Sequence, residues 1–594
     1  MPSLPSTLLD ALDRAAASWP DAPALRYERD GRWLTRTWSE YRGDVRLAAR
    51  GLMALGLEPG QGVAIMSFNR PEWFLANLGA IAAGGVPAGI YTTSSAEQCR
   101  YVAEHAGAVV AVLQDRELLG RFGAFEQRPP RLATAVLLDD APERAGVLGW
   151  SRLLERAREV SEQDLERRLA SLRPAQLATL IYTSGTTGHP KAVMLSHRNL
   201  VWTAAQVVRH SGMSSRDVLL SYLPLCHIAE QSLSHHAPLL SGACTAFAES
   251  MEKLPDNLRE IRPHVFFGVP RVWEKMQSAI ATAASRRPAP LRKLGAWARR
   301  VGLRAGYAQQ RGDRPPRLLP LARRLVHAPV RRRLGLDRAR ICATSAAPIS
   351  TGTLEYFLGL GIPILEVYGM SECSGPATAA RPDRYRIGSA GFVLDEAGLR
   401  TAEDGEILIR GPHVFLGYYR DAESTRAALD PDGWLHSGDI GTIDADGFLR
   451  VTDRKKELII TAGGKNVAPQ LIEAKLRQIA AISQAVVIGD RRAYLTALLT
   501  LDPARLPEQA ERAGSPARTP QQACGCPVFR DWLERRIAEV NASLARYEGI
   551  KRFGLLPREL SVAADELTPT LKLKRRVISE RYASEIERLY AAPS

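Results

Sequence analysis

Short apolar strands that alternate with amphipathic helices constrain this chain more than any other feature. The apolar runs Gly62–Ser67, Ala88–Tyr91 and Ala108–Leu113 have the length of buried strands. The predicted helices around them are Leu8–Ser18, Trp38–Leu55, Pro71–Ala83 and Ser95–His105. Strands joined by helices of this length form parallel sheets that are covered by helices on both faces. The sequence therefore predicts a layered α/β architecture.

The pattern changes near Asp439. Strand-forming residues and Asp-Gly turns dominate from there to Thr461, and predicted helices and strands are mixed beyond it. These elements are the helix Gln470–Ile479, the strands Gln484–Gly489 and Tyr494–Leu501, and the helix Phe529–Tyr547. The stretch Pro503–Cys526 is rich in Pro, Ala and Gln, and we expect a mobile loop insertion there.

The length of 594 residues exceeds what one hydrophobic core usually supports. We therefore predict two domains of the α/β class. A large N-terminal domain, 1–452, contains layered α/β subdomains and a β-rich subdomain. A small, mobile α+β domain follows at 453–594. The charged run Asp453-Arg454-Lys455 lies between predicted strands and is the expected hinge.

The net charge of +15 is concentrated in one segment. Residues 286–340 contain 17 Lys or Arg and 2 Asp or Glu, and this difference equals the whole excess. Trp297 and several leucines lie among these arginines, a pattern that suits peripheral binding to an anionic membrane. The alternative is a solvated helical insertion in a protein from an arginine-rich proteome. No recognised binding motif accompanies the charge, so we expect no nucleic-acid partner.

The seven cysteines are scattered, apart from Cys524 and Cys526. An odd, unpatterned set without a secretory signal indicates a reducing compartment. We expect a cytoplasmic protein that binds peripherally at the inner membrane face through residues 286–340. The Cys-Gly-Cys pair could bind metal, but no second ligand pair lies nearby, and a loop is the favoured interpretation. The apolar stretch Phe74–Tyr91 is interpreted as a helix running into a strand, not a membrane span.

The most specific segment is Tyr182-Thr-Ser-Gly-Thr-Thr-Gly-His-Pro-Lys191. A strand, Ala178–Tyr182, leads into a loop of glycine and hydroxyl residues that ends in a lysine. Backbone N–H groups and hydroxyls in such a loop can bind phosphate oxygens, and glycine permits close approach. Pro190 stands where a Walker A loop requires glycine before its lysine. The segment therefore predicts a phosphate loop of another kind.

This string resembles the signature loop of the adenylate-forming (AMP-binding) superfamily, which includes acyl-CoA synthetases, adenylation domains and luciferases. The string Tyr368-Gly-Met-Ser-Glu372 is similar to the family's second core motif, and Ser345-Ala-Ala-Pro348 to its adenine-side turn. The resemblance implies that Tyr368 stacks on adenine and that Glu372, with Thr186, holds Mg²⁺. The implied catalytic residues are Lys572, Glu372, Thr186 and Lys191. The implied ATP- and AMP-binding residues are Thr183, Ser184, Gly185, Thr187, Gly188, Ser345, Ala346, Ala347, Tyr368, Gly369, Ser371, Asp439 and Arg454.

The remaining motifs follow in the family's order. The string Ser437-Gly-Asp439 resembles the motif whose aspartate accepts hydrogen bonds from both ribose hydroxyls, and Arg454 in the hinge would also reach the ribose. Gly463 and Gly464 resemble the glycine pair beside the pantetheine tunnel of CoA. The string Leu567-Thr-Pro-Thr-Leu-Lys572 looks like the final motif, whose lysine offsets charge that develops at the α-phosphorus. A departure is Ala192, where the family usually has glycine.

Three strings resemble the long-chain fatty acyl-CoA synthetase branch, especially its bubblegum-type members and their bacterial relatives. They are Ser221–Glu230, Gly268–Glu274 and Glu457–Gly464. The resemblance places His227 at the carboxylate end of the acyl site. It implies that ATP, with Mg²⁺, and a fatty acid give an acyl-adenylate and pyrophosphate. The small domain then swings about the hinge, CoA attacks, and acyl-CoA and AMP leave.

Three alternatives remain. A fatty acyl-AMP ligase would pass the acyl group to a carrier protein, but the insertion typical of such enzymes is not evident between Gly411 and Asp453. An adenylate-dependent oxygenase such as a luciferase shares the ATP motifs but not the long-chain strings. A catalytically silent lipid-binding or scaffold protein on this fold would not need Lys191, Glu372, Asp439 or Lys572.

Overall fold

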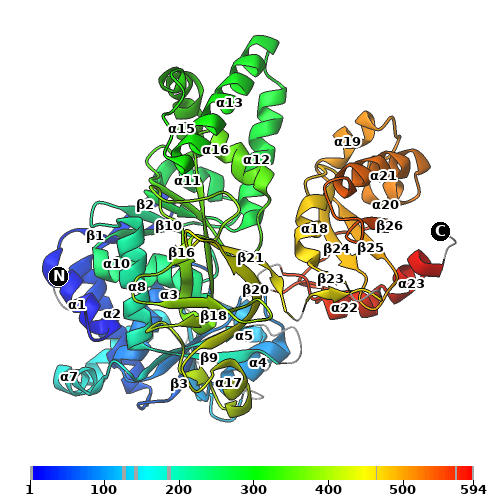
Figure 1. The fold of residues 1–594 in the computed structure, drawn as a ribbon. Helices are drawn as coiled ribbons and strands as arrows, with labels where there is room; N and C mark the ends of the chain where they lie inside the picture. Colours follow the sequence, from blue (N-terminus) through cyan, green and yellow to red (C-terminus); the bar gives the residue numbers. More distant parts are fainter. Residues whose placement is uncertain are drawn as a thin grey trace. The chain divides into compact units, whose positions relative to one another are not determined.

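The computed structural model describes residues 4–123, 129–139, 145–183, 189–455, 457–462, 465–568 and 572–591. It separates into two compact units (Figure 1). The large unit contains residues 1–346, 355–400 and 408–436. The small unit contains residues 347–354, 401–407 and 437–594.

One sheet of the large unit is built mainly from parallel strands that are buried on both faces. Its order is β19 (Gly417–Tyr418), β9 (Lys191–Ser196), β8 (Leu177–Thr183), β4 (Val86–Gly89), β3 (Gly62–Met66), β5 (Ala108–Leu113), β6 (Thr134–Leu137) and β7 (Val147–Gly149). Strand β3 is buried along its whole length and pairs in parallel with β4 and β5. The continuous apolar run that predicted it is what burial on both faces requires. At the other end of the sheet, β9 pairs antiparallel with both β8 and β19.

The second sheet of the large unit brings together strands from distant parts of the chain. Its order is β16 (Phe392–Val393), β15 (Gly375–Ala379), β14 (Ile364–Met370), β13 (Ile341–Thr344), β12 (Val265–Phe267), β10 (Val218–Ser221), β11 (Cys244–Phe247), β1 (Pro23–Arg29) and β2 (Arg32–Thr37). Strands β12, β13 and β14 are parallel, so their carboxyl ends share one edge. The antiparallel strand β15 then returns along β14.

Helices pack on these sheets where the periodicity predicted them. The first four are α1 (Leu8–Ser18), α2 (Trp38–Ala54), α3 (Pro71–Ala82) and α4 (Ala96–His105). Capping boxes at Thr37–Glu40 and Ser95–Gln98 explain the starts of α2 and α4, since each satisfies backbone N–H groups at a helix end. The other helices of this part are α5 (Arg116–Gly120), α6 (Trp150–Arg156), η2 (Ala157–Glu159), α7 (Glu162–Ser171), α8 (His197–Ser211), α9 (Ile228–Glu230), η3 (Gln231–His236), α10 (Ala237–Ser241), α11 (Leu254–Ile261), α16 (Thr351–Gly359), η5 (Ser371–Cys373) and α17 (Ala422–Ala428).

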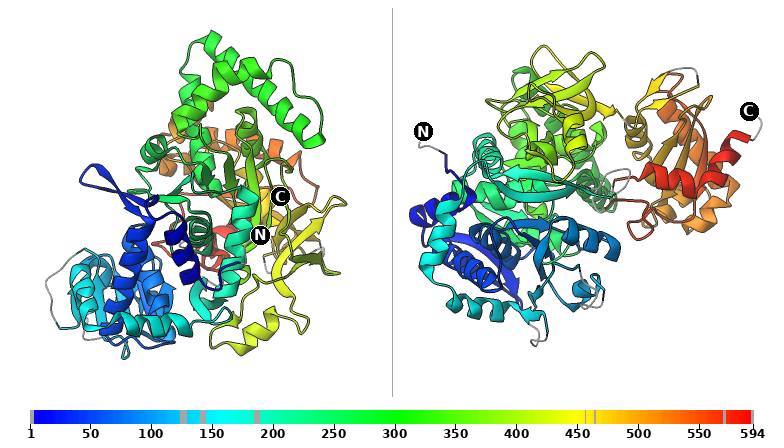
Figure 2. Two further views of the ribbon diagram at one scale, coloured as in Figure 1. Left: turned by 90° about the vertical axis from the view of Figure 1, so that its left-hand side faces the viewer. Right: turned by 90° about the horizontal axis from the view of Figure 1, so that it is seen from below.

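The arginine-rich segment is helical. It follows directly after α12 (Pro270–Ser285) and contains α13 (Ala289–Arg311), α14 (Leu319–Ala322), η4 (Arg323–His327) and α15 (Ala328–Leu334). Helices α12 and α13 lie side by side and protrude from the large unit (Figures 1 and 2). In the parts of the chain that the structure describes, no helix has both the length and the apolar character needed to cross a membrane.

The small unit is organised around a sheet in the order β24 (Ile482–Ile488), β25 (Leu495–Leu501) and β26 (Ile550–Leu556). Alternate residues of β24 are buried in two different hydrophobic cores. Ala485 and Val487 belong to one core, and Val486 belongs to the other. Its helices are α18 (Pro469–Leu476), α19 (Leu506–Arg512), α20 (Pro520–Cys524), α21 (Pro527–Asn541), α22 (Arg575–Arg581) and α23 (Ala583–Ala591). A four-stranded sheet is formed by β17 (Gly398–Thr401), β18 (Glu406–Arg410), β20 (Leu435–Ile443) and β21 (Leu449–Arg454), of which residues 401–407 and 437–454 belong to the small unit. The small unit also contains the strand pair β22 (Ile459–Ile460) and β23 (Asn466–Val467).

The predicted fold class, mixed α/β with a large and a small part, is confirmed. The expectation of a mobile loop at Pro503–Cys526 is wrong, because this stretch folds as α19 and α20. Leu506 and Ala510 lie one helical turn apart and are buried in the core of the small unit. A capping box at Thr519 starts α20. The Pro and Gln content concealed a short amphipathic period.

Candidate active site

The predicted phosphate loop begins and ends on paired strands. Thr183, the last residue of β8, is the cross-strand partner of Lys191, the first residue of β9. The Thr183 hydroxyl donates to the Lys191 carbonyl oxygen at 3.4 Å. The predicted loop residues Ser184, Gly185, Thr186, Thr187 and Gly188 lie outside the described residues. The ladder between β8 and β9 thus fixes both ends of the loop.

Lys191 and Glu372 are brought together by a residue that the sequence did not indicate, Tyr418 in β19. The Tyr418 hydroxyl donates to Glu372 Oε1 at 2.8 Å. Lys191 Nζ lies 4.9 Å from the centre of the Tyr418 ring and donates to Ser424 Oγ at 2.6 Å. Burial, and next the Glu372 carboxylate, raises the pKa of Tyr418 well above its usual value, so its hydroxyl stays protonated. A cation, a phenol and a carboxylate therefore share one site.

Backbone geometry fixes the residues before Glu372. Tyr368 is buried in β14, and the register with β15 shifts between Tyr368 and Gly369. A Cβ atom on Gly369 would lie 1.9 Å from the Gly375 carbonyl oxygen, so only glycine fits there. Ser371 and Glu372 follow in η5, and both side chains are buried.

The predicted adenine-side turn follows β13, the neighbour of β14. Thr344 and Glu366 are register partners in these parallel strands, so Ser345 and Tyr368 emerge at the same edge of the sheet. Ala346 has a φ of 75°, which places an alanine in the left-handed region. The next residue, Ala347, belongs to the small unit.

Asp439 and Arg454 are cross-strand partners in β20 and β21 of the small unit. Arg454 Nε lies 3.2 Å from Asp439 Oδ1. The Asp439 side chain is buried, whereas that of Arg454 is 41% exposed. The two predicted ribose-binding residues therefore form one ion pair with an accessible guanidinium.

The predicted hinge is the end of β21. Asp453 is buried, and burial raises its pKa to about 7 although the Arg454 N–H and Arg575 oppose the shift. Lys455 Nζ pairs with Asp404 at 2.6 Å and with Glu406 at 3.0 Å. The predicted CoA residues Gly463 and Gly464 lie outside the described residues.

His227 and Lys572 occupy separate parts of the chain. His227 caps α9, because its Nδ1 accepts the Ala229 N–H at 3.2 Å, and it is half-buried. The Lys572 backbone N–H donates to Thr568 Oγ1 at 3.0 Å, and its carbonyl accepts the Thr568 N–H at 2.8 Å. Lys572 thus lies on a short hairpin in the small unit.

Two protein-family profiles together match most of the chain. The profile of the AMP-binding enzyme family matches residues 12–419, and that of the AMP-binding enzyme C-terminal domain matches residues 456–594. The chain belongs to the AMP-binding enzyme family. The predicted resemblance to this superfamily is therefore confirmed.

The bubblegum-type branch is confirmed as well. The long-chain-fatty-acid–CoA ligase ACSBG2 of Xenopus laevis is 38% identical over 620 residues, covering 99% of this chain and 84% of that protein. ACSBG1 of Homo sapiens is 37% identical over 622 residues, covering 99% of this chain and 86% of that protein. The similarity extends through both units.

Solved structures of a CoA ligase and a CoA synthetase share the fold. The anthranilate CoA ligase AuaEII in complex with anthranoyl-AMP has a TM-score of 0.74 at 19% identity, covering 99% of both chains. The o-succinylbenzoate CoA synthetase of Bacillus subtilis in complex with ATP and magnesium has a TM-score of 0.67 at 21% identity, covering 95% of this chain and 98% of that one.

The described residues are chemically suited to the Mg²⁺ that AMP-binding enzymes use with ATP. Mg²⁺ commonly takes one or two carboxylates together with substrate phosphates and water. Glu372 offers a buried carboxylate that the Tyr418 hydroxyl orients. Thr186, the other predicted ligand, lies outside the described residues. Among the described side chains, no cluster of three or more His, Cys, Asp or Glu residues could hold a metal.

Proposed function

We propose that this protein is an ATP-dependent long-chain fatty acid–CoA ligase that works through an acyl-adenylate. The observation that carries the proposal is the identity of 38% with a long-chain-fatty-acid–CoA ligase over 99% of this chain. The contacts among Lys191, Tyr418 and Glu372 support it, because they assemble the charges that a nucleotide phosphate site requires.

In the first half-reaction, the fatty carboxylate attacks the α-phosphorus of ATP and pyrophosphate leaves. Lys191 and the loop before it bind the phosphates, and Tyr368 stacks on the adenine. Asp439 accepts hydrogen bonds from the ribose, and Lys572 offsets charge at the α-phosphate. Catalysis of this kind depends on positioning and charge stabilisation. Bound with ATP at Glu372, Mg²⁺ would neutralise phosphate charge.

In the second half-reaction, the CoA thiolate attacks the acyl carbonyl and AMP leaves. The site must exclude CoA from the first step and admit it to the second, which a moving domain achieves. We assign that movement to residues 453–594, turning about residues 453–455. Gly463 and Gly464 would border the CoA path, and His227 the carboxylate end of the acyl site.

The test is to incubate the protein with ATP, Mg²⁺ and palmitate, with and without CoA, and to measure AMP, palmitoyl-AMP and palmitoyl-CoA by mass spectrometry. We expect palmitoyl-CoA only when CoA is present. Lys572→Ala should slow palmitoyl-AMP formation by about 10²–10³-fold, the usual effect of removing a group that stabilises developing charge. Palmitoyl-AMP that accumulates regardless of CoA would identify a carrier-protein ligase instead. No adenylate with any fatty acid would overturn the proposal.

We also propose that the helical segment 286–340 binds an anionic bilayer on the cytoplasmic side, where ATP and CoA are available. Throughout this segment, which the structure describes completely, only Arg311 and Arg340 form ion pairs with carboxylates. Arg331 donates instead to the backbone carbonyls of Leu336, Ala339 and Gly361. The exposed arginines of the segment, such as Arg317, Arg323 and Arg324, are therefore available to lipid phosphates. Leu318, Leu321 and Leu325 are about half-exposed and lie on one helical face among them.

Co-sedimentation with vesicles tests this surface. The wild-type protein should bind vesicles that contain phosphatidylglycerol and not vesicles of phosphatidylcholine alone. Changing Arg317, Arg323 and Arg324 to Gln should reduce binding to the anionic vesicles. The control is Arg152→Gln with Arg156→Gln, because Arg152 is exposed and Arg156 partly exposed, but they pair with Glu155 and Glu159. Equal binding by the test and control variants would refute the proposal.

A further inference from the structure

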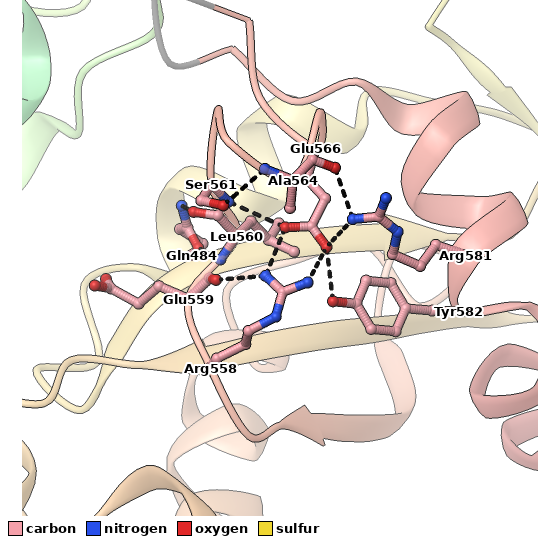
Figure 3. Close-up of polar contacts among 9 residues, drawn as sticks. All are labelled: Gln484, Arg558, Glu559, Leu560, Ser561, Ala564, Glu566, Arg581 and Tyr582. Carbon is pink, nitrogen blue, oxygen red and sulfur yellow. Dashed lines mark hydrogen bonds and ion pairs between the residues drawn. The ribbon is translucent and has the colours of Figure 1, made fainter.

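The carboxylate of Glu566, in the small unit, accepts hydrogen bonds from several side chains and from the backbone (Figure 3). Its side chain is fully buried. Arg558 donates to both of its oxygens, at 2.7 and 2.6 Å. The other donors are Arg581 at 3.0 Å, the Tyr582 hydroxyl at 2.8 Å and the Ser561 N–H at 3.0 Å. Charge-assisted bonds of this number fix the position of a side chain.

Glu566 is also the first residue of the hairpin that carries Lys572. We call residues 566–568 and 572–574 the Lys572 hairpin. The Glu566 carbonyl accepts the Lys574 N–H at 2.9 Å, and Leu567 pairs antiparallel with Leu573. Thr568 then holds Lys572 through two hydrogen bonds. Glu566 therefore binds the surrounding framework through its side chain and the second strand of the hairpin through its backbone.

The groups around Glu566 are themselves fixed to the sheet. Gln484 in β24 accepts the Leu560 N–H at 2.7 Å and donates to the Leu560 carbonyl at 3.2 Å. The Arg558–Ser561 segment is thereby attached to the sheet. Arg581 in α22 also donates to the Ala564 carbonyl at 2.6 Å. The carboxylate thus connects the sheet, α22 and the hairpin.

The second strand of the Lys572 hairpin is also attached to the rest of the small unit, through the residue that follows it. Arg575, directly after Lys574, donates to both carboxylate oxygens of Glu473 in α18 at 2.8 Å. Its Nε also donates to Glu457 at 3.3 Å. With both strands held at their bases, little freedom remains for the hairpin to tilt within the small unit.

We propose that Glu566 is a positioning residue for Lys572 and that it serves the adenylation half-reaction selectively. This inference rests on the proposed function, in which Lys572 acts on the α-phosphate and is withdrawn before CoA attacks. Loss of the Glu566 charge frees the base of the hairpin, and a displacement of about 1 Å can cost on the order of 10²-fold in rate. The thioester step, which does not use Lys572, keeps its rate.

The experiment measures each half-reaction of Glu566→Gln in the full-length protein. Palmitate-dependent exchange between ATP and pyrophosphate reports adenylation, and conversion of supplied palmitoyl-AMP and CoA reports thioester formation. We expect exchange to fall by roughly 10- to 100-fold, while the thioester step stays within about threefold of wild type. Glu587→Gln is the matched control, because Glu587 also pairs with an arginine of the small unit, Arg492, but on the surface. It should leave both rates unchanged.

A milder variant distinguishes a loss of positioning from a loss of folding. Tyr582→Phe removes one hydrogen bond and leaves both arginines paired, and it should lower exchange by a few-fold without slowing the thioester step. Parallel loss of both half-reactions in the two variants, or no loss in either, would overturn the inference. A wild-type protein that catalyses neither half-reaction would instead overturn the proposed function, so the two failures are distinguishable.

Discussion

Glu230 in the large unit and Glu566 in the small unit are both buried glutamates, yet their pKa values move in opposite directions. Burial raises the pKa of Glu230 to about 7, although the Ser221 and Ser234 hydroxyls oppose the shift. Burial also acts on Glu566, but bonds from Arg558, Tyr582, the Ser561 N–H and Arg581 outweigh it and hold the pKa at about 2.

The pKa values of the two glutamates differ because their hydrogen-bond and ion-pair partners differ. Among the described residues, Glu230 forms no ion pair and its Oε1 has no hydrogen-bond partner, whereas Glu566 pairs with two arginines. A buried carboxyl group without a cation favours its neutral form. The segment that carries Glu230 is the one predicted from the sequence to border the acyl site, where a neutral interior would suit an alkyl chain. The Glu566 region must instead hold a charged hairpin in place.

The largest expected effect is on the acid stability of the small unit. The folded pKa of Glu566 lies below its usual value of 4.5, so its contribution is present above pH 4.5 and is lost as pH falls toward 2. A shift of this size corresponds to about 3 kcal/mol. Hydrogen exchange of peptides that span residues 558–582, at pH 5 and pH 3, should show this loss in wild type but not in Glu566→Gln. An equal loss in both proteins would contradict the assignment.

The contribution of Glu230 to stability should depend on pH in the opposite direction. Its folded pKa lies above the usual value, so the large unit should lose stability as pH rises from 4.5 to 7, by up to about 3 kcal/mol. Glu230→Gln should flatten this dependence and make the large unit more stable than wild type at pH 8. Urea unfolding at pH 5 and pH 8 measures it. A variant that is less stable than wild type at pH 8 would show that the carboxylate is stabilised after all.

Removing one partner of Glu566 should have a smaller effect. Arg558→Met leaves Arg581 and Tyr582 in place, and we expect a loss of about 2 kcal/mol, typical of hydrogen bonds to a charged group. Local opening free energies from hydrogen exchange at pH 7 provide the measurement. The surface pair Arg492–Glu587 supplies the control, since Arg492→Met should cost less than about 0.5 kcal/mol. Equal losses of stability in Arg558→Met and Arg492→Met would contradict the expectation that the buried pair contributes more than the surface pair.

The smallest effect on stability is expected from substitutions in the arginine-rich segment. Arg317, Arg323 and Arg324 are exposed and form no ion pair in this fully described stretch, so changing all three to Gln should alter stability by less than about 0.5 kcal/mol. Differential scanning fluorimetry of the variant used for vesicle binding checks this. A large change would mean that these arginines hold the fold, and the loss of vesicle binding would need another explanation.

The strongly periodic elements and the order of the motifs could be predicted from the sequence. Helix α1 has the predicted bounds, and α2 and α4 begin at the capping residues, because helical period and cap chemistry are local properties. The prediction of a phosphate loop likewise rests on the string Tyr182–Lys191 alone. Short elements such as α19 were missed, because two turns give too few residues for a period to stand out from the composition.

The contacts between side chains from distant segments could be found only in the tertiary structure. Tyr418 reaches Glu372 because β19 pairs with β9, and Lys191 contacts Ser424 across 233 residues of sequence. Glu566 likewise stands in the sequence as one acid before a recognised motif, and its role follows from Arg558 and Arg581 converging on it. Local patterns record backbone preference, whereas the neighbours of a buried charge depend on strand pairing and packing between distant segments.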